Sequence, residues 1–260
     1  MLPERIKVRP PIKLPTENLT LEPYASILCY PHARLLELES RIQELWRLGV
    51  EAVEFVGEGS ASNVPVLGKG YVGIVVVAYA RGKRYALKMR RIDADRVDMT
   101  NEAEMLKKAN AVGVGQKFVA VSNNFLLSQL IDGSLLEGWL EKHKEKPLMR
   151  KVLVNILEQC WRLDEAGLDH GELSKAPRHL LVDKADVPFI VDFETASIQR
   201  KIANVTSVCQ YLFAGNSQVP KMITQTFGDR DRFKIIATLK HFKKNRSRES
   251  FEGLLQVCLS

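Results

Sequence analysis

The stretch from Leu67 to Val75 reads LGKGYVGIV, with glycines at positions 68, 70 and 73. Because glycine has no Cβ, a turn of this kind lets the backbone come close to phosphate oxygens. The same spacing opens a helix in dinucleotide-binding folds. Here, however, residues 74–79 read IVVVAY, an apolar and largely β-branched run that predicts a strand. The stretch therefore predicts a glycine-rich loop between two strands, with candidate phosphate-binding residues Gly68, Lys69, Gly70 and Gly73.

A lysine lies on the strand that is predicted to return from this hairpin. Residues 81–83 (RGK) predict the turn, and residues 84–88 (RYALK) predict the strand, which ends in Lys88. Its Ala-Leu-Lys is a close variant of the Val-Ala-Ile-Lys that lies over ATP in protein kinases. At this point the chain resembles the protein-kinase-like superfamily. The resemblance implies ATP as the cofactor, with Lys88 on its α- and β-phosphates.

The composition limits the classes of protein to consider. The 260 residues are 45% hydrophobic, enough for one large core or two small ones. No run approaches a membrane span, residues 1–4 (MLPE) do not begin a signal peptide, and no membrane partner is expected. The four cysteines form no Cys-x-x-Cys pair, which argues against a zinc site and predicts a cytoplasmic protein. The net charge of +7 fits a nucleic-acid or acidic partner and an ordinary basic enzyme surface equally well.

Residues 1–50 precede the predicted sheet and form the first predicted region. Residues 1–25 contain five prolines without periodicity, which predicts an extended arm. Pro31 suits the first turn of a helix, and apolar residues then recur at helical spacing from Leu35 to Leu48, until Gly49. This predicts a helix that covers one face of the sheet.

A second candidate for the phosphate loop follows the first predicted strand, residues 52–56. Residues 57–62 read GEGSAS, similar to the Gly-x-Gly-Ser of many kinases, although a polar turn would look the same. Residues 68–73 are preferred because they contain the third glycine and lead directly to Lys88.

The resemblance implies two further contributions from residues 51–131, the predicted small lobe. A helix is expected to begin near Thr100, and Glu102 is the carboxylate expected to pair with Lys88, with Glu104 on another side of the helix. Residues 119–121 and 125–131 predict two more strands. Their end, Gln129, Leu130 and Ile131, matches the hinge whose backbone binds adenine in the family.

The predicted helical lobe, residues 132–260, contains the second diagnostic stretch. Residues 167–174 read GLDHGELS, where many kinase-like enzymes have His-Gly-Asp-Leu. Glu172 replaces the aspartate that accepts the proton of the substrate hydroxyl, and His170 is expected to brace the loop. His179 replaces the metal-binding asparagine. Because neutral histidine prefers transition metals to magnesium, His179 is a metal ligand or merely a packing or hydrogen-bonding residue.

Two carboxylates follow the next predicted strand. Residues 187–191 (VPFIV) lead into Asp192-Phe193-Glu194, which is similar to the Asp-Phe-Gly of kinases. The resemblance implies that Asp192 binds Mg²⁺, with Mn²⁺ as an alternative ion. Glu194 replaces the glycine, as in some choline and aminoglycoside kinases, and either binds a second ion or lines the cleft.

The remaining chain has no Ala-Pro-Glu and suffices for only a few helices, predicted at 204–213, 232–242 and 250–259. This compact design resembles the RIO kinases, the small kinase of the KEOPS complex and similar archaeal serine/threonine kinases. The expected fold is α+β, a two-lobed kinase-like fold with a reduced helical lobe.

The expected activity is ATP-dependent transfer of a phosphoryl group to a protein serine or threonine. The alternatives are a small-molecule kinase of the aminoglycoside or choline type, and a nucleotide-binding pseudokinase or ATPase in an RNA or ribosomal assembly. Residues 240–248 are the densest basic run, either a solvated helix end or an RNA-facing surface.

Overall fold

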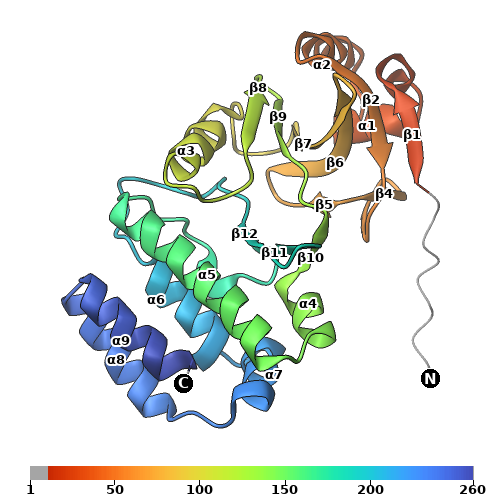
Figure 1. Ribbon diagram of the computed structural model, residues 1–260. Coiled ribbons are helices and arrows are strands. Elements are labelled where there is room, and N and C mark those ends of the chain that lie inside the picture. Colours follow the sequence, from red (N-terminus) through yellow and green to blue (C-terminus); the bar gives the residue numbers. More distant parts are fainter. Residues whose placement is uncertain (1–10, 260) are drawn as a thin grey trace. The chain divides into compact units, whose positions relative to one another are not determined.

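The computed structural model describes residues 11–259 and divides the chain into two compact units (Figure 1). Unit 1 comprises residues up to 104 together with 117–130, and unit 2 comprises residues 105–116 and 131 onwards. One unit is dominated by an antiparallel sheet and the other by helices, so the predicted α+β class is confirmed. Among the described residues, no helix combines the length and the apolar character that crossing a membrane requires.

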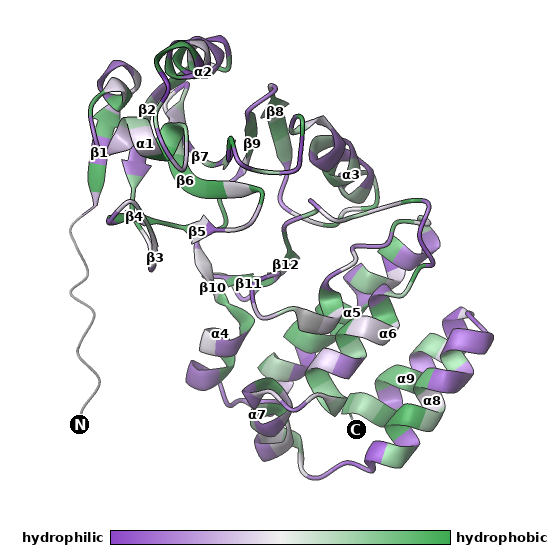
Figure 2. Ribbon diagram, turned by 180° about the vertical axis from the view of Figure 1, so that it is seen from behind, coloured by the Kyte–Doolittle hydropathy of each residue, from purple (hydrophilic) through white to green (hydrophobic). Residues whose placement is uncertain are grey.

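Unit 1 is built on a seven-stranded sheet in which all neighbouring strands are antiparallel. The strand order is β1-β2-β6-β7-β9-β8, and β5 pairs with β6. Strand β6 is largely hydrophobic along its length (Figure 2), because both of its faces are covered. The strands are β1 (Ile12–Pro15), β2 (Val50–Phe55), β5 (Gly68–Lys69), β6 (Gly73–Ala80), β7 (Lys83–Arg90), β8 (Phe118–Val121) and β9 (Phe125–Gln129).

The hairpin of β6 and β7 fixes the position of Lys88. Its two-residue turn contains Arg81 and Gly82, which have φ angles of 50° and 70°. Positive φ at both central residues matches the right-handed twist of paired strands, and glycine adopts it without steric cost. The resulting register pairs Val75 with Lys88, so the lysine lies at the centre of the sheet.

Short helices pack around the sheet of unit 1. They are η1 (Thr16–Thr20), α1 (Tyr24–Leu28) and α2 (Leu35–Arg47), and the first turn of α3 (Thr100–Ala111) also belongs to this unit. Helix α2 is the helix predicted from the apolar spacing, but it begins at Leu35 and not at Pro31, and it contacts β2. Of the predicted arm, residues 1–10 lie outside the described residues, while β1 pairs with β2.

A buried polar network connects α2 to the far end of β7. The Arg41 side chain is fully buried, and its guanidinium donates to the Leu28 and Arg90 carbonyls at 2.7 and 2.6 Å. A third bond reaches Asn124 Oδ1 at 2.9 Å, and the Asn124 amide donates to Glu44 at 2.6 Å. Because each buried polar group has a partner, the helix is fixed in one position against the strand that carries Lys88.

Arg41→Met tests this network. The change leaves two buried carbonyl oxygens without their donor, so we expect the free energy of unfolding to fall by about 3–5 kcal/mol. Urea unfolding followed by tryptophan fluorescence measures it. Arg47→Met, an exposed position in the last turn of the same helix, is the control. Equal stability of the two variants would show that the network contributes nothing.

Unit 2 consists of helices around a small three-stranded antiparallel sheet. Its longest helix is α5, whose buried face repeats at helical spacing as the sequence predicted. The strands are β10 (Gly133–Leu135), β11 (Leu180–Asp183) and β12 (Pro188–Ile190). The helices are α4 (Leu136–Lys142), α5 (Lys146–Glu165), η2 (Leu173–Lys175), α6 (Asn204–Cys209), η3 (Gln210–Ala214), α7 (Gln218–Phe227), α8 (Arg232–Lys244) and α9 (Arg248–Leu259).

Helix α7 was not predicted from the sequence. Its proline, Pro220, lies in the first turn, where a missing N–H costs nothing because it has no partner in the helix. From there Met222, Ile223 and Phe227 form an apolar stripe that packs inward. This apolar stripe is sufficient for a helix although the segment contains a proline.

Candidate functional site

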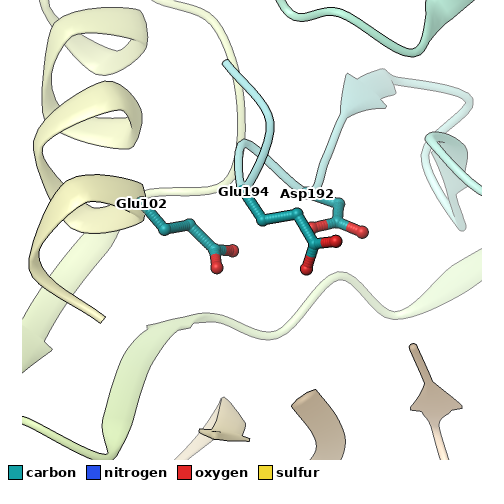
Figure 3. A group of neighbouring side chains, drawn as sticks. All are labelled: Glu102, Asp192 and Glu194. Atoms are coloured by element: carbon teal, nitrogen blue, oxygen red, sulfur yellow. The ribbon is translucent and has the colours of Figure 1, made fainter. Parts of the chain in front are cut away.

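In unit 1, Lys88 and Glu102 form an ion pair. Lys88 Nζ lies 3.0 Å from Glu102 Oε1, and the two side chains are only 11% and 6% exposed. Glu102 extends from the first turn of α3 (Figure 3), whereas Glu104 is exposed to solvent. A carboxylate this close keeps the lysine charged and fixes its position. The sheet and the helix therefore present one oriented ammonium group.

The third glycine of the loop lies directly against Lys88. A Cβ added to Gly73 would be 3.1 Å from Lys88 Cγ and 2.9 Å from the Met89 carbonyl oxygen. Any larger residue would therefore displace the lysine. Gly68 and Gly70 are different: a Cβ on the first meets nothing within 4 Å, and a Cβ on the second meets only the Gly73 carbonyl at 3.7 Å. The fold itself does not require glycine at these two places.

In the alternative loop at residues 57–62, the fold itself requires glycine at positions 57 and 59. It leads into a hairpin of β3 (Gly59–Ala61) and β4 (Val64–Val66). A Cβ on Gly59 would approach the Val66 carbonyl oxygen to 2.9 Å, and one on Gly57 would overlap the same atom. Of the two candidate loops, it is therefore residues 68–73 that lie against the lysine.

The predicted adenine-binding residues lie at the end of β9, where unit 1 ends after Leu130 and unit 2 begins with Ile131. The Gln129 N–H donates to the Lys117 carbonyl at 2.8 Å, and its side-chain oxygen accepts from the Lys117 N–H at 3.2 Å. Gln129 is thus held in the sheet, whereas Leu130 and Ile131 follow the last paired residue. Adenine binding by all three stays a prediction.

In unit 2, a buried histidine joins two loops. His170 Nε2 lies 3.0 Å from the Val191 carbonyl oxygen, and since a carbonyl can only accept, this nitrogen carries the proton. The ring packs against Phe193 at a centroid distance of 5.0 Å. Burial lowers the pKa of His170 to about 4, so the ring is neutral at physiological pH. His170 therefore has a structural role, as predicted, and connects the loop that carries Glu172 to Val191.

Helix α6 supports the same loop through residues that sequence reasoning missed. Asn204 Oδ1 accepts the His170 N–H at 2.8 Å, and its amide donates to Asp164 at 2.8 Å and to the Leu168 carbonyl at 2.7 Å. Burial raises the pKa of Asp164, while the bonds from Asn204 act in the opposite direction. The sequence contained a signal for this contact, because Asp164 is an acidic residue on the buried stripe of α5 and a buried carboxylate needs a partner.

Glu172 contacts His179, the residue that replaces asparagine in the resemblance. His179 Nε2 lies 3.2 Å from Glu172 Oε2 and 3.8 Å from Asp192 Oδ2. This ring nitrogen therefore lies beside both carboxylates. Both alternatives for His179, a metal ligand and a packing or hydrogen-bonding residue, stay predictions.

Glu194 is the third acidic residue of the two loops that carry Glu172 and Asp192. Oxygens of Asp192 and Glu194 lie within 4.8 Å of each other, and both side chains come from the segment after β12 (Figure 3). Asp192 has a φ of 70°, a left-handed conformation that few non-glycine residues adopt and that often marks a functional position. Carboxylate oxygens are the ligands that Mg²⁺ and Mn²⁺ prefer, so this donor pair fits such an ion.

The basic run at residues 240–248 covers the end of α8 and the start of α9. Arg248 is already paired with Glu158 at 2.7 Å and with Glu252 at 2.9 Å. Arg246 donates to the Ile202 carbonyl. Both arginines make contacts within unit 2, whereas Lys240, Lys243 and Lys244 are exposed. An RNA-facing role for the run stays a prediction.

A comparison with curated proteins identifies a similar archaeal protein. The chain is 30% identical over 118 residues to a protein of Methanocaldococcus jannaschii described as "Uncharacterized protein MJ1211". The match covers 98% of that protein and 45% of this chain. The chain belongs to the family of this archaeal protein. No family model matches the chain.

The buried histidine predicts how stability depends on pH. The unfolded His170 binds a proton near pH 6.5 and the folded one only near pH 4, so its contribution is complete above pH 6.5 and is lost toward pH 4. We expect a loss of roughly 3 kcal/mol across this range. His170→Gln keeps a donor to Val191 but does not titrate, so it should reduce the dependence. Urea unfolding at pH 7 and pH 4.5 measures the difference.

The exposed His241 on α8 gives the control for this experiment. His241→Gln should leave the pH dependence of the parent chain intact. If His170→Gln were as pH-dependent as His241→Gln, the imidazole of His170 would not be the group responsible.

Proposed function

We propose that the protein is an ATP- and Mg²⁺-dependent phosphotransferase with a two-lobed kinase-like fold, acting on a serine or threonine hydroxyl of another protein. The observation that carries the proposal is the buried Lys88–Glu102 pair lying against Gly73 of the glycine loop. A charged lysine fixed beside a glycine loop on neighbouring strands is an arrangement suited to phosphate oxygens.

Unit 1 would supply the nucleotide-binding groups. Lys88 neutralises phosphate charge, and Glu102 keeps the ammonium charged and oriented while the nucleotide enters. Because a loop without Cβ atoms at Gly68 and Gly70 has room above its backbone, its amides would cover the phosphates. Catalysis of phosphoryl transfer is mostly positioning and charge neutralisation, so few groups are needed.

Unit 2 would supply the metal and acceptor groups. Asp192 and Glu194 provide oxygens for Mg²⁺, which when bound neutralises charge on the transferred phosphoryl group. The acceptor hydroxyl attacks the γ-phosphorus, the bond from that phosphorus to the β,γ-bridging oxygen breaks, and ADP leaves. Glu172 would accept the hydroxyl proton, and His179 Nε2 lies 3.2 Å from its carboxylate.

A small-molecule acceptor is the second candidate, and the connection after the metal-binding carboxylates favours it. Helix α6 begins at Asn204, so only residues 195–203 separate it from Glu194. A connection this short leaves little chain for an ordered peptide-binding segment. The nucleotide-binding pseudokinase differs from both candidates in transferring nothing.

Incubation with γ-labelled ATP and Mg²⁺ tests the proposal. We expect label on an added protein acceptor, or on an aminoglycoside or choline if the second candidate is right. Lys88→Met should reduce transfer by about 10²–10³-fold, because it removes the charge that positions the phosphates. Lys83→Met, an exposed position on the same strand, is the control. Full activity of Lys88→Met would place the essential lysine elsewhere.

Glu172→Gln separates an enzyme from a pseudoenzyme. The change keeps the size of the side chain but removes its proton affinity, so transfer should fall by about 10²–10⁴-fold while ATP binding survives. Glu165→Gln, at the exposed end of α5, should behave as the parent chain. Transfer by Glu172→Gln at the parent rate would remove this carboxylate from the mechanism.

A further inference from the structure

A cluster of side chains outside the sites described above holds the tip of the glycine loop, residues 69–72. Tyr30 follows α1, and its carbonyl oxygen accepts the Ile92 N–H at 2.9 Å. This bond fixes the backbone of the N-terminal helical segment just beyond the end of β7. The phenol ring of Tyr30 is therefore held next to the strand pair that carries the loop.

The Tyr30 ring attracts two cations. Lys69 Nζ, from the loop, donates to the Tyr30 hydroxyl at 2.5 Å and lies 4.3 Å from the ring centroid. Arg91 Cζ lies 5.0 Å from the same centroid. Cations near an aromatic ring are attracted by its quadrupole. The Lys69 ammonium is thereby engaged with Tyr30, and the side chain connects the loop to the N-terminal segment.

Arg91 holds the backbone of the loop at two points. Its Nη1 donates to the Gly70 carbonyl at 2.8 Å, and its own N–H donates to the Val72 carbonyl at 2.8 Å. Its Nε and Nη2 donate to Asp93 at 2.9 and 2.7 Å. A bidentate pair of this kind fixes the plane of the guanidinium group, so the remaining donor keeps its direction toward Gly70.

The orientation of one peptide bond follows from these contacts. A trans peptide is planar, and its carbonyl oxygen and N–H point in opposite directions. When Arg91 holds the Gly70 carbonyl, the Tyr71 N–H must point to the other side of the loop. We propose that Tyr30 and Arg91 are positioning residues, which turn this N–H toward the phosphates of ATP. The inference rests on the proposed function of the loop.

The physical benefit is preorganisation. A loop with glycines at positions 68, 70 and 73 has high conformational freedom, and ordering it on binding would cost conformational entropy. Contacts that order the loop beforehand remove part of this cost from nucleotide binding. Their loss should therefore raise KM for ATP and leave kcat nearly unchanged, because substrate and transition state lose the same binding.

Two measurements on Tyr30→Ala test the inference. Hydrogen–deuterium exchange of the nucleotide-free protein should become faster in residues 68–73 and stay unchanged in β6 and β7 beyond the loop. The KM for ATP should rise about tenfold, with kcat within about twofold, as expected for the loss of a charged hydrogen bond and a cation–π contact. Tyr30→Phe should show a smaller change in the same direction.

Two further variants complete the design. Arg91→Gln removes the guanidinium and keeps Tyr30, so it should give the same two effects if Tyr30→Ala fails to fold. His32→Ala, an exposed change in the same segment, should give neither. Unchanged exchange in residues 68–73, or faster exchange with unchanged KM, would overturn the inference while leaving the proposed function in place. If exchange in residues 68–73 of Tyr30→Ala is faster but the parent chain binds no ATP, the proposed function is wrong. The contacts of Tyr30 and Arg91 with the loop would then still order it.

Discussion

The ion pair between Lys88 and Glu102 is the interaction on which the proposed function of the first unit depends. Burying two charges removes them from water, and their mutual attraction seldom does more than compensate for this loss. A pair that is 11% and 6% exposed is therefore a poor source of stability. A buried ion pair of this kind can instead serve to orient a charged group for binding. Two features of the surroundings fix the position of the lysine. Gly73 leaves room for the lysine stem, and the buried Arg41 network fixes the end of the same strand.

The second unit fixes its carboxylates in a different way. Here the buried brace is neutral: the His170 ring holds the Val191 carbonyl, and Asn204 holds the backbone of His170. These bonds connect the loop of Glu172 to the loop of Asp192 without a buried charge. As a result, the acidic side chains of Glu172, Asp192 and Glu194 lie on two loops that are tied to one another, as the proposed metal-binding and proton-accepting roles require.

Sequence reasoning was strongest where the signal was local. The β6–β7 hairpin, the helix that presents Glu102 and the buried face of α5 follow from periodicity and turn chemistry. It failed for polar residues whose partners lie far along the chain. Arg41 looks like a surface arginine until Asn124 and the Arg90 carbonyl are placed beside it. Tyr30 carries no motif, yet it holds the loop. The two glycine loops could not be separated from spacing alone, because only the packing shows which glycines the fold itself requires.

The proposed function requires that the protein binds one Mg·ATP and that Asp192 is a ligand of its metal ion. Calorimetric titration of ATP, with and without Mg²⁺, into the parent chain and into Asp192→Asn tests this claim most directly. We expect one ATP per chain and tighter binding with Mg²⁺. In Asp192→Asn most of that gain should disappear, while metal-free ATP should bind at least as well, since a negative charge has been removed. No binding of ATP to the folded parent chain at millimolar concentration, or an undiminished gain from Mg²⁺ in Asp192→Asn, would contradict the claim.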